Sequence, residues 1–210
     1  MVELGQIALI LSFMMATYST VVGFAGGMLN GRDLAASARW GFYSICPLLI
    51  LATASLIYAF VTNDFSVKYV AENSNIAMPK IYSWVAFYSG NAGSLLYIAV
   101  AFSVMAGITI RILNSKLPYT SPYALGVMSM VLLFFLAVIL FLANPLERHQ
   151  IALEDGQGMN PLLIHFGMFI HPPFQMLGLI SVALPFSIAI GALLAGRGGR
   201  DEWVDQGRLW

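Results

Sequence analysis

Two histidines near the end of the chain are the residues whose type and spacing most clearly suggest chemistry. His165 and His171 lie in the stretch NPLLIHFGMFIHPPF (Asn160–Phe174), and Pro172 and Pro173 follow the second histidine directly. Side chains six residues apart lie about 120° from a shared helix face, and neither a carboxylate nor a cysteine stands between the two histidines. The pair therefore lacks the His-x-x-x-His spacing of a helical zinc site.

The double proline constrains the backbone of His171. Proline disfavours the α conformation in the residue before it, so we expect His171 to be extended, with its ring at the mouth of the last apolar segment. A neutral imidazole at the boundary of lipid and water can donate a lone pair to a flat, apolar ligand with a polar edge, and haem has these properties. A solvated or capping histidine is the alternative that the residues alone leave open.

The other reactive side chains give weaker indications. Cys46 is the single cysteine, so an internal disulfide, a zinc cluster and a Cys-x-x-Cys redox pair are excluded, and a small buried side chain is expected instead. Glu154 and Asp155 are adjacent, which is typical of a solvated turn rather than a catalytic pair. The sequence contains no P-loop, dinucleotide-binding or Gly-x-Ser-x-Gly motif.

Composition places this chemistry at a membrane. Hydrophobic residues make up 59% of the 210 residues and charged residues only 10%, whereas soluble domains carry about 25% charged residues. No basic stripe is present, which excludes nucleic-acid binding. The first apolar run, Leu4–Gly31, is too long for a signal peptide and lacks a basic region before it, so we expect it to be a retained membrane helix.

Charge-free stretches predict an all-α polytopic membrane protein with about five transmembrane helices in a single domain, residues 1–210. Each stretch exceeds the roughly 20 residues that a helix needs to cross the hydrocarbon core, and no alternating ten-residue segments of a β-barrel occur. Pro47 and Pro185 fall inside predicted spans and should kink them. The predicted spans are about Leu4–Gly27, Gly41–Thr62, Gly93–Ile112, Ser121–Ala143 and Pro173–Ala195.

The distribution of basic residues predicts the orientation. The carboxyl ends of the first, third and fifth spans and the segments after them hold seven lysines and arginines, and the longer segments after the second and fourth hold three. The positive-inside rule then places the amino terminus outside and the carboxyl terminus in the cytoplasm. Two outer loops result, Asn63–Asn91 and Asn144–Pro172. The aromatic-rich Tyr82–Tyr88 in the first loop is expected as a short amphipathic element at the interface.

Four motifs in these regions resemble those of a known family. They are YAFVTNDFSVKYVAENSN (Tyr58–Asn75), GNAGSLL (Gly90–Leu96), NPLER (Asn144–Arg148) and NPLLIHFGMFIHPP (Asn160–Pro173). Their order and spacing resemble the amino-terminal third of the CcmF-type cytochrome c haem lyases, and the relatives dedicated to nitrite reductase share this pattern.

The resemblance implies a polytopic protein of the bacterial or mitochondrial inner membrane that handles haem on its outer face. Such a lyase takes haem from a haem chaperone and joins it to the cysteines of apocytochrome c by thioether bonds. His171 would be an axial ligand to a b-type haem, whereas His149 and His165 match no ligand of the family. Arg148 would contact a haem propionate or an acidic partner, with a solvated arginine as the alternative.

Three departures from the family pattern shape the expectation. Asn91–Ala92 stands where the family usually has His-Glu, a tryptophan-rich segment is absent, and no histidine follows His171. We therefore expect a fragment or split-gene product that forms an enzyme only with the remaining part of the lyase and its thiol-handling partners. The alternatives are a structural subunit of a respiratory or photosynthetic membrane complex and, less well supported, a transporter, since no mid-membrane charge marks a pathway.

Overall fold

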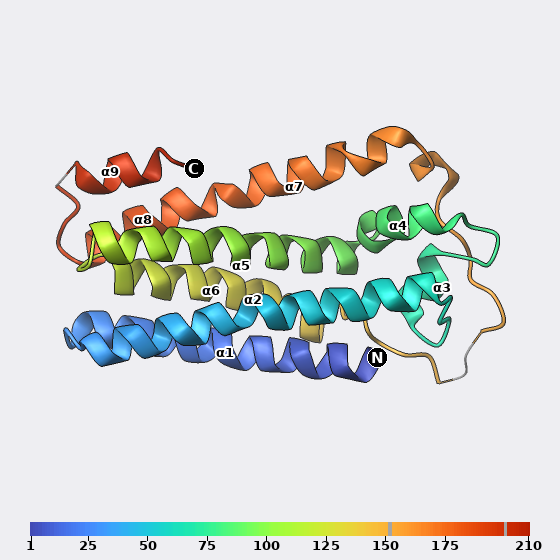
Figure 1. The fold of residues 1–210 in the computed structure, drawn as a ribbon, viewed down its shortest axis with the longest axis horizontal. Helices are drawn as coiled ribbons and strands as arrows, with labels where there is room; N and C mark the ends of the chain where they lie inside the picture. The colour runs from blue at the N-terminus through green and yellow to red at the C-terminus, as the bar shows by residue number, and fades with distance from the viewer. Residues whose placement is uncertain (151–152, 200) are drawn as a thin grey trace.

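Long, roughly aligned helices form the body of the molecule (Figure 1). The computed structural model describes residues 1–150, 153–199 and 201–210, and within these residues the helices include five spans long and apolar enough to cross a membrane. The predicted all-α class and five spans are thus confirmed. The long helices are α1 (Val2–Met28), α2 (Arg32–Val61), α5 (Asn91–Lys116), α6 (Ser121–Phe141) and the consecutive pair α7 (His171–Ser181) and α8 (Ala183–Leu194).

The start of α2 differs most from the predicted span boundaries. Helix α2 begins at Arg32 rather than at Gly41, because Arg32, Asp33 and Arg39 extend the helix past the apolar core into a polar zone. Asp33 in the first turn also interacts favourably with the helix dipole. Charge marks where lipid ends, and the helix continues beyond that point.

The fifth span is interrupted at Val182, which separates α7 from α8. Pro185 has no N–H for the carbonyl of Ser181, and its ring crowds that carbonyl, so the regular ladder breaks one turn before the proline. At the same point, the Ser181 hydroxyl donates to the carbonyl of Gly178 at 2.7 Å. The predicted effect of Pro185 is therefore confirmed as a break in the helix, whereas α2 remains one helix through Pro47.

Helices α1 and α2 form the most extensive helix–helix interface of the described chain. Small residues allow the close approach: a Cβ on Gly26 would lie 2.8 Å from the backbone nitrogen of Ala35, and one on Gly41 would lie 2.9 Å from Ser19 Oγ. Asn30 ends α1 in a left-handed conformation, with φ of 51°, and the following N–H, of Gly31, donates to the carbonyl of Gly26 at 3.0 Å. This helix-ending motif turns the chain directly into α2.

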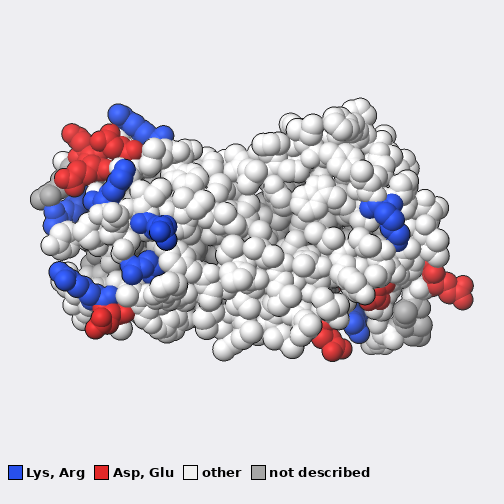
Figure 2. Space-filling model, in the orientation of Figure 1, with Lys and Arg blue, Asp and Glu red and all other residues white. Residues whose placement is uncertain are grey.

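Charged side chains gather at the two ends of the molecule and leave a broad apolar middle (Figure 2). Large apolar side chains are exposed along the helices, among them Val21, Phe134 and Leu179 at 63%, 64% and 72%. An uncharged, apolar girdle of this kind suits lipid rather than water. The protein is therefore an integral membrane protein.

Short helices occupy the ends of the bundle. The connections between α2 and α5 and between α6 and α7 lie together at one end, and α9 folds back beside α8 at the other (Figure 1). The short elements are α3 (Lys68–Asn73), η1 (Lys80–Tyr82), α4 (Ser83–Ser89), η2 (Pro161–Leu163), η3 (Phe166–Phe169) and α9 (Glu202–Gly207).

Candidate functional site

The two long connections fold together into one structure, which we call the loop cap: residues 63–90 and 144–170, of which 151 and 152 lie outside the described part. Backbone hydrogen bonds join them directly. The Lys68 N–H donates to the Glu147 carbonyl at 2.9 Å, and the His149 N–H donates to the Ser66 carbonyl at 2.8 Å. These bonds flank an antiparallel bridge between Val67 and Arg148. The NPLER motif is therefore tied to the loop that follows α2.

A second set of bonds joins the connections after the undescribed residues. The Gln157 N–H donates to the Ala71 carbonyl at 2.7 Å, and the Gly158 N–H donates to the Ser74 carbonyl at 3.1 Å. Asp155 Oδ1 accepts from the Ile76 N–H at 2.9 Å. Asp155 thus holds the two connections together, which agrees with the predicted turn and gives this carboxylate a structural role.

Tyr69 anchors the loop cap to the start of α5. Its hydroxyl lies 3.1 Å from the Phe87 carbonyl and 3.2 Å from the Gly90 carbonyl, and it accepts from the Gly90 N–H at 2.9 Å. Burial raises the pKa of Tyr69 to about 12. Gly93 lies against the same turn, where any Cβ would overlap the Phe87 carbonyl oxygen. The GNAGSLL motif is therefore a packing motif of the loop cap.

The aromatic segment Tyr82–Tyr88, predicted as a short amphipathic element at the interface, is helical and packs mostly inward. Val85, Phe87 and Tyr88 are buried, at 0%, 1% and 2% exposure, and Trp84 is exposed at 40%. The interfacial anchoring expected for this segment applies to Trp84, whereas the other side chains fill the loop cap. The Tyr88 hydroxyl also donates to the Met168 carbonyl at 2.7 Å, and burial raises the pKa of Tyr88 to about 12.

His171 is the first residue of α7 and is exposed. The expectation of an extended backbone was wrong: the Phe174 N–H donates to the Ile170 carbonyl at 3.3 Å, which closes a helical turn around the double proline. Prolines in the first turn cost no hydrogen bond, because those N–H groups have no partner within the helix. The His171 imidazole makes no hydrogen bond with any described residue and remains available to a ligand.

The other two histidines are placed differently. His165 is exposed, and its Nδ1 accepts from the Gly167 N–H at 3.0 Å as the cap of η3. The alternative of a capping histidine is thus confirmed for His165. His149 is half-buried at the bridge described above. Among the described residues, neither ring combines exposure with a lack of hydrogen-bond partners as His171 does, and the choice of His171 as the haem ligand stays a prediction.

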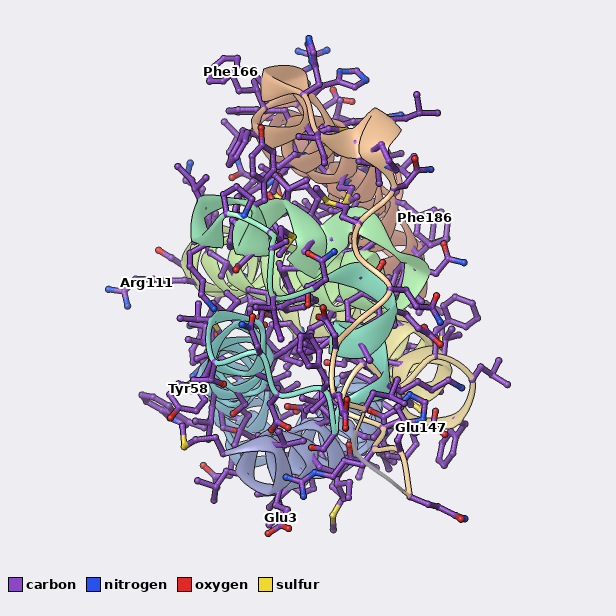
Figure 3. The ribbon with its side chains drawn as sticks, turned by 90° about the vertical axis from the view of Figure 1, so that its right-hand side faces the viewer. Glu3, Tyr58, Arg111, Glu147, Phe166 and Phe186 are labelled. Carbon is purple, nitrogen blue, oxygen red and sulfur yellow. The ribbon has the colours of Figure 1, made fainter. Side chains whose placement is uncertain are left out.

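Arg148 lies away from His171. Its guanidinium is 3.9 Å from a carboxylate oxygen of Glu3, with both side chains largely in solvent. Figure 3 looks onto this end of the molecule and shows Glu3 and Phe166, which precedes α7, on opposite sides. The described residues therefore do not bring Arg148 and His171 into one site, and the contact of Arg148 with a propionate stays a prediction.

The segments on either side of His171 in the chain carry exposed apolar side chains. Leu162, Phe166 and Phe174 are exposed at 86%, 72% and 69%. One unpartnered imidazole beside such a surface fits one face of a haem, which needs an axial nitrogen and apolar contacts. His165, the other described histidine of this segment, offers no second axial nitrogen in this arrangement: its Nδ1 accepts from the Gly167 N–H, so the proton of the neutral ring lies on Nε2. The described residues also contain no group of three or more histidine, cysteine, aspartate or glutamate side chains placed to hold a metal ion.

Sequence reasoning missed the residues that position α7. Besides the Tyr88–Met168 bond, the hydroxyl of Tyr97 on α5 lies 3.4 Å from the Pro173 carbonyl, and Pro173 is itself buried. These contacts join residues about eighty positions apart, and only the presence of tyrosines at the predicted interface hinted at them.

The known proteins similar to this chain are named as cytochrome c-type biogenesis proteins. No family model matches the chain. The cytochrome c-type biogenesis protein CcmF of Pseudomonas fluorescens is 36% identical over 215 residues, covering 99% of this chain and 32% of that protein. The biogenesis protein Ccl1 of Rhodobacter capsulatus is 35% identical over 197 residues, covering 93% and 30%. CcmF of Escherichia coli is 33% identical over 201 residues, covering 94% and 31%.

A solved structure shares the fold. The cytochrome c heme lyase CcmF superposes with a TM-score of 0.82 at 22% sequence identity, over 100% of this chain and 33% of that one. The chain thus spans about a third of the length of the curated relatives and of the solved structure that it matches.

Proposed function

The chain is a CcmF-type sequence that corresponds to the amino-terminal part of these cytochrome c biogenesis proteins, and on this premise we propose that it serves cytochrome c maturation as the part of a haem lyase that presents haem through His171. The observation that carries the proposal is the exposed His171 at the start of α7, whose imidazole is unpartnered among the described residues. The relatives are named for cytochrome c biogenesis, and the solved structure for a haem lyase.

The chain's own contribution would be to position and shelter haem. His171 would supply one axial nitrogen to a b-type haem, and Phe166 and Phe174 would cover part of the macrocycle. Bound haem would supply the vinyl groups that react with the thiols of apocytochrome c. The second ligand and a tryptophan-rich surface would come from the remaining part of the lyase, with haem delivered by a haem chaperone and the substrate cysteines kept reduced by thiol-handling partners.

Arg148 has a secondary place in this proposal. Its guanidinium is half-exposed beside Glu3, so it can still meet a propionate of haem bound across the cap or an acidic surface of a partner. The competing description is an arginine that only marks the membrane edge.

The orientation belongs to the same proposal. We place the loop cap on the outer face of a bacterial or mitochondrial inner membrane, because the opposite end holds most of the basic residues, as the positive-inside rule requires. Haem attachment would then take place on the side from which cytochrome c substrates are reached.

The central test replaces His171 with alanine or glycine in cells that carry the rest of the lyase. Both variants should abolish cytochrome c maturation, measured by haem staining of the product. Added imidazole should restore part of it by filling the vacated position, more with glycine because it leaves more room. The matched controls His149→Ala and His165→Ala should mature cytochrome c at nearly the normal level.

Normal maturation by His171→Ala with haem still bound would show that the ligand assignment is wrong. Normal maturation in cells whose parent chain and His171→Ala variant both bind no haem would instead favour the second candidate, a structural subunit of a respiratory or photosynthetic membrane complex that kept the fold and lost haem handling. The observation behind that candidate is Asn91, which starts α5 directly after the loop cap. Asn91 and Ala92 stand where the family resemblance leads one to expect His-Glu.

A labelling experiment tests the orientation. In a Cys46→Ser background, Leu162→Cys and Ser115→Cys place a thiol at opposite ends of the bundle, on side chains that are exposed. A membrane-impermeant maleimide added to sealed cells should label the first variant and leave the second unlabelled until the membrane is opened. Equal labelling of the two variants in sealed cells would contradict the proposed topology.

A further inference from the structure

A cavity lies at the end of the bundle opposite the loop cap. It has a volume of about 190 Å³ and is formed between the α5–α6 turn and the segment that joins α8 to α9. This volume is below the roughly 300 Å³ of a small-molecule pocket and corresponds to about six water molecules at 30 Å³ each. The cavity therefore suits a compact polar group rather than a cofactor.

Two cations line the cavity. Lys116 ends α5, and Arg197 follows α8. Neither side chain has a carboxylate oxygen within 4 Å among the described residues. The ion pairs of the described residues involve other basic side chains. Glu202 is the carboxylate of the wall, so these three side chains together leave one positive charge facing the cavity.

Two contacts hold Arg197 in the wall of the cavity. The guanidinium of Arg197 lies 4.7 Å above the ring of Tyr119, and its backbone N–H donates to the Ala192 carbonyl at 2.8 Å. Thr120, the N-cap of α6, makes no capping hydrogen bond with its side chain and lines the same space. The positive end of the α6 dipole thus adds to the two cations.

The surroundings indicate where the bound group comes from. The cavity lies where apolar spans end, and Tyr119, exposed at 63%, and Trp203, which donates to the Gly198 carbonyl at 3.0 Å, border it. Tyrosine and tryptophan concentrate at the headgroup level of membranes, and basic pockets at the ends of membrane helices bind lipid headgroups.

We infer that this cavity binds the phosphate of an anionic membrane phospholipid through Lys116 and Arg197. The phosphate oxygens accept from the ammonium and the guanidinium, the Thr120 hydroxyl supplies a further donor, and the acyl chains continue along the apolar surface of the bundle. A phosphatidylglycerol headgroup, with one negative charge, complements the net positive charge of the wall. This site is at the other end of the molecule from His171 and does not depend on haem handling.

The test measures lipid binding by the purified chain with native mass spectrometry in detergent. Phosphatidylglycerol should bind at lower concentration than phosphatidylcholine, and Lys116→Gln and Arg197→Gln should each weaken its binding roughly tenfold, as expected for the loss of one charge-assisted contact. Glu202→Gln should strengthen binding, because it removes the opposing charge. Arg111→Gln is the matched control, since it removes an exposed basic residue at the same end that does not line the cavity.

The same experiment includes controls for misfolding and for the identity of the bound phosphate, lipid or inorganic. Lys116→Arg keeps the charge and should retain binding, so a loss confined to Lys116→Gln reflects charge rather than misfolding. Equal phosphatidylglycerol binding by Lys116→Gln, Arg197→Gln and Arg111→Gln would overturn the inference. Displacement of the lipid by millimolar inorganic phosphate alone would also overturn it, because it would identify a site for a soluble anion.

Discussion

The loop cap consists of two parts that are held in place very differently. Residues 63–78, 144–150 and 153–158 form an interlocked part, in which backbone groups of one connection bond those of the other at 2.7–3.1 Å. Residues 160–171 form a histidine segment, tied to the rest chiefly by the Tyr88–Met168 bond and covered by exposed side chains such as Leu162 and Phe166.

The difference shows how a membrane protein can expose reactive groups at its surface. Backbone bonds between the connections restrict the interlocked part without depending on its side chains. The histidine segment contacts α4 through the Tyr88–Met168 bond, and α7 packs against α5, so His171 has a defined position while its ring stays open to solvent. Local stability should accordingly differ between the two parts, because the histidine segment has fewer buried contacts.

The largest expected effect comes from Gly93, where the interlocked part meets α5. Gly93→Ala would force a Cβ into the Phe87 carbonyl oxygen, so that α4 or the start of α5 must shift. We expect a loss of about 3 kcal/mol or more in the free energy of unfolding, measured by denaturant titration in detergent micelles.

Gly178 provides the matched control. A Cβ there meets nothing within 4 Å, and the residue lies inside α7. Gly178→Ala should stabilise the protein by about 0.5–1 kcal/mol, because alanine favours the helix. Similar unfolding curves for the two variants would contradict the close packing of Gly93 against the Phe87 carbonyl.

Removal of the Tyr69 hydroxyl should cause the next largest loss in the free energy of unfolding. Tyr69→Phe leaves the Gly90 N–H and the nearby carbonyls without this partner, and we expect a loss of about 1–3 kcal/mol. Tyr58→Phe, at a tyrosine that is 53% exposed, should change the free energy of unfolding by less than about 0.5 kcal/mol.

The pH dependence of the unfolding free energy provides a second test of the Tyr69 hydroxyl. Burial raises the pKa of Tyr69 from 10.0 to about 12, so the folded protein keeps a proton that the unfolded chain loses. The contribution of Tyr69 to the free energy of unfolding is therefore complete below pH 10. It decreases between pH 10 and 12, by up to about 1.4 kcal/mol per pH unit. Tyr69→Phe should flatten this decline, although Tyr88, whose pKa is also raised to about 12, would preserve part of it. An unchanged slope would mean that Tyr69 is solvated.

Arg148 should have the smallest effect on stability. Its pair with Glu3 is exposed and 3.9 Å long, and such pairs contribute about 0–1 kcal/mol. Arg148→Gln should leave the unfolding free energy within about 0.5 kcal/mol of the parent. A larger loss would show that charge pairs help to hold the interlocked part. Unchanged haem retention by this variant would remove Arg148 from the proposed haem contacts.

The sequence predicts the transmembrane body well because lipid imposes one simple rule. An uncharged stretch of more than about 20 residues must satisfy its backbone internally, and only a helix does so within one segment. The predicted Ser121–Ala143 and the observed α6, Ser121–Phe141, differ by two residues at one end. The start of α2 was misplaced because charged residues continue the helix outside the lipid, where the rule no longer applies.

The loop cap could not be predicted in the same way. Its hydrogen bonds join backbone groups, such as those of Ser66 and His149, that are far apart in the chain and leave no periodic pattern of side chains. For His171, the local preference of a residue before proline was overridden by the turn that closes from Ile170 to Phe174. The family resemblance identified which histidine to test, whereas the structure determined how its ring is presented.

The glycine-lined contact between α1 and α2 has a consequence for biosynthesis. The two helices are joined by only residues 29–31, so their contacts are local in sequence and lose little chain entropy on closing. This hairpin can assemble once residue 61 has entered the bilayer, before α5, α6 or the loop cap has been synthesised. Later helices would then be added to a preformed template, and a bulky residue at Gly26 would impair insertion of the nascent chain from its first step.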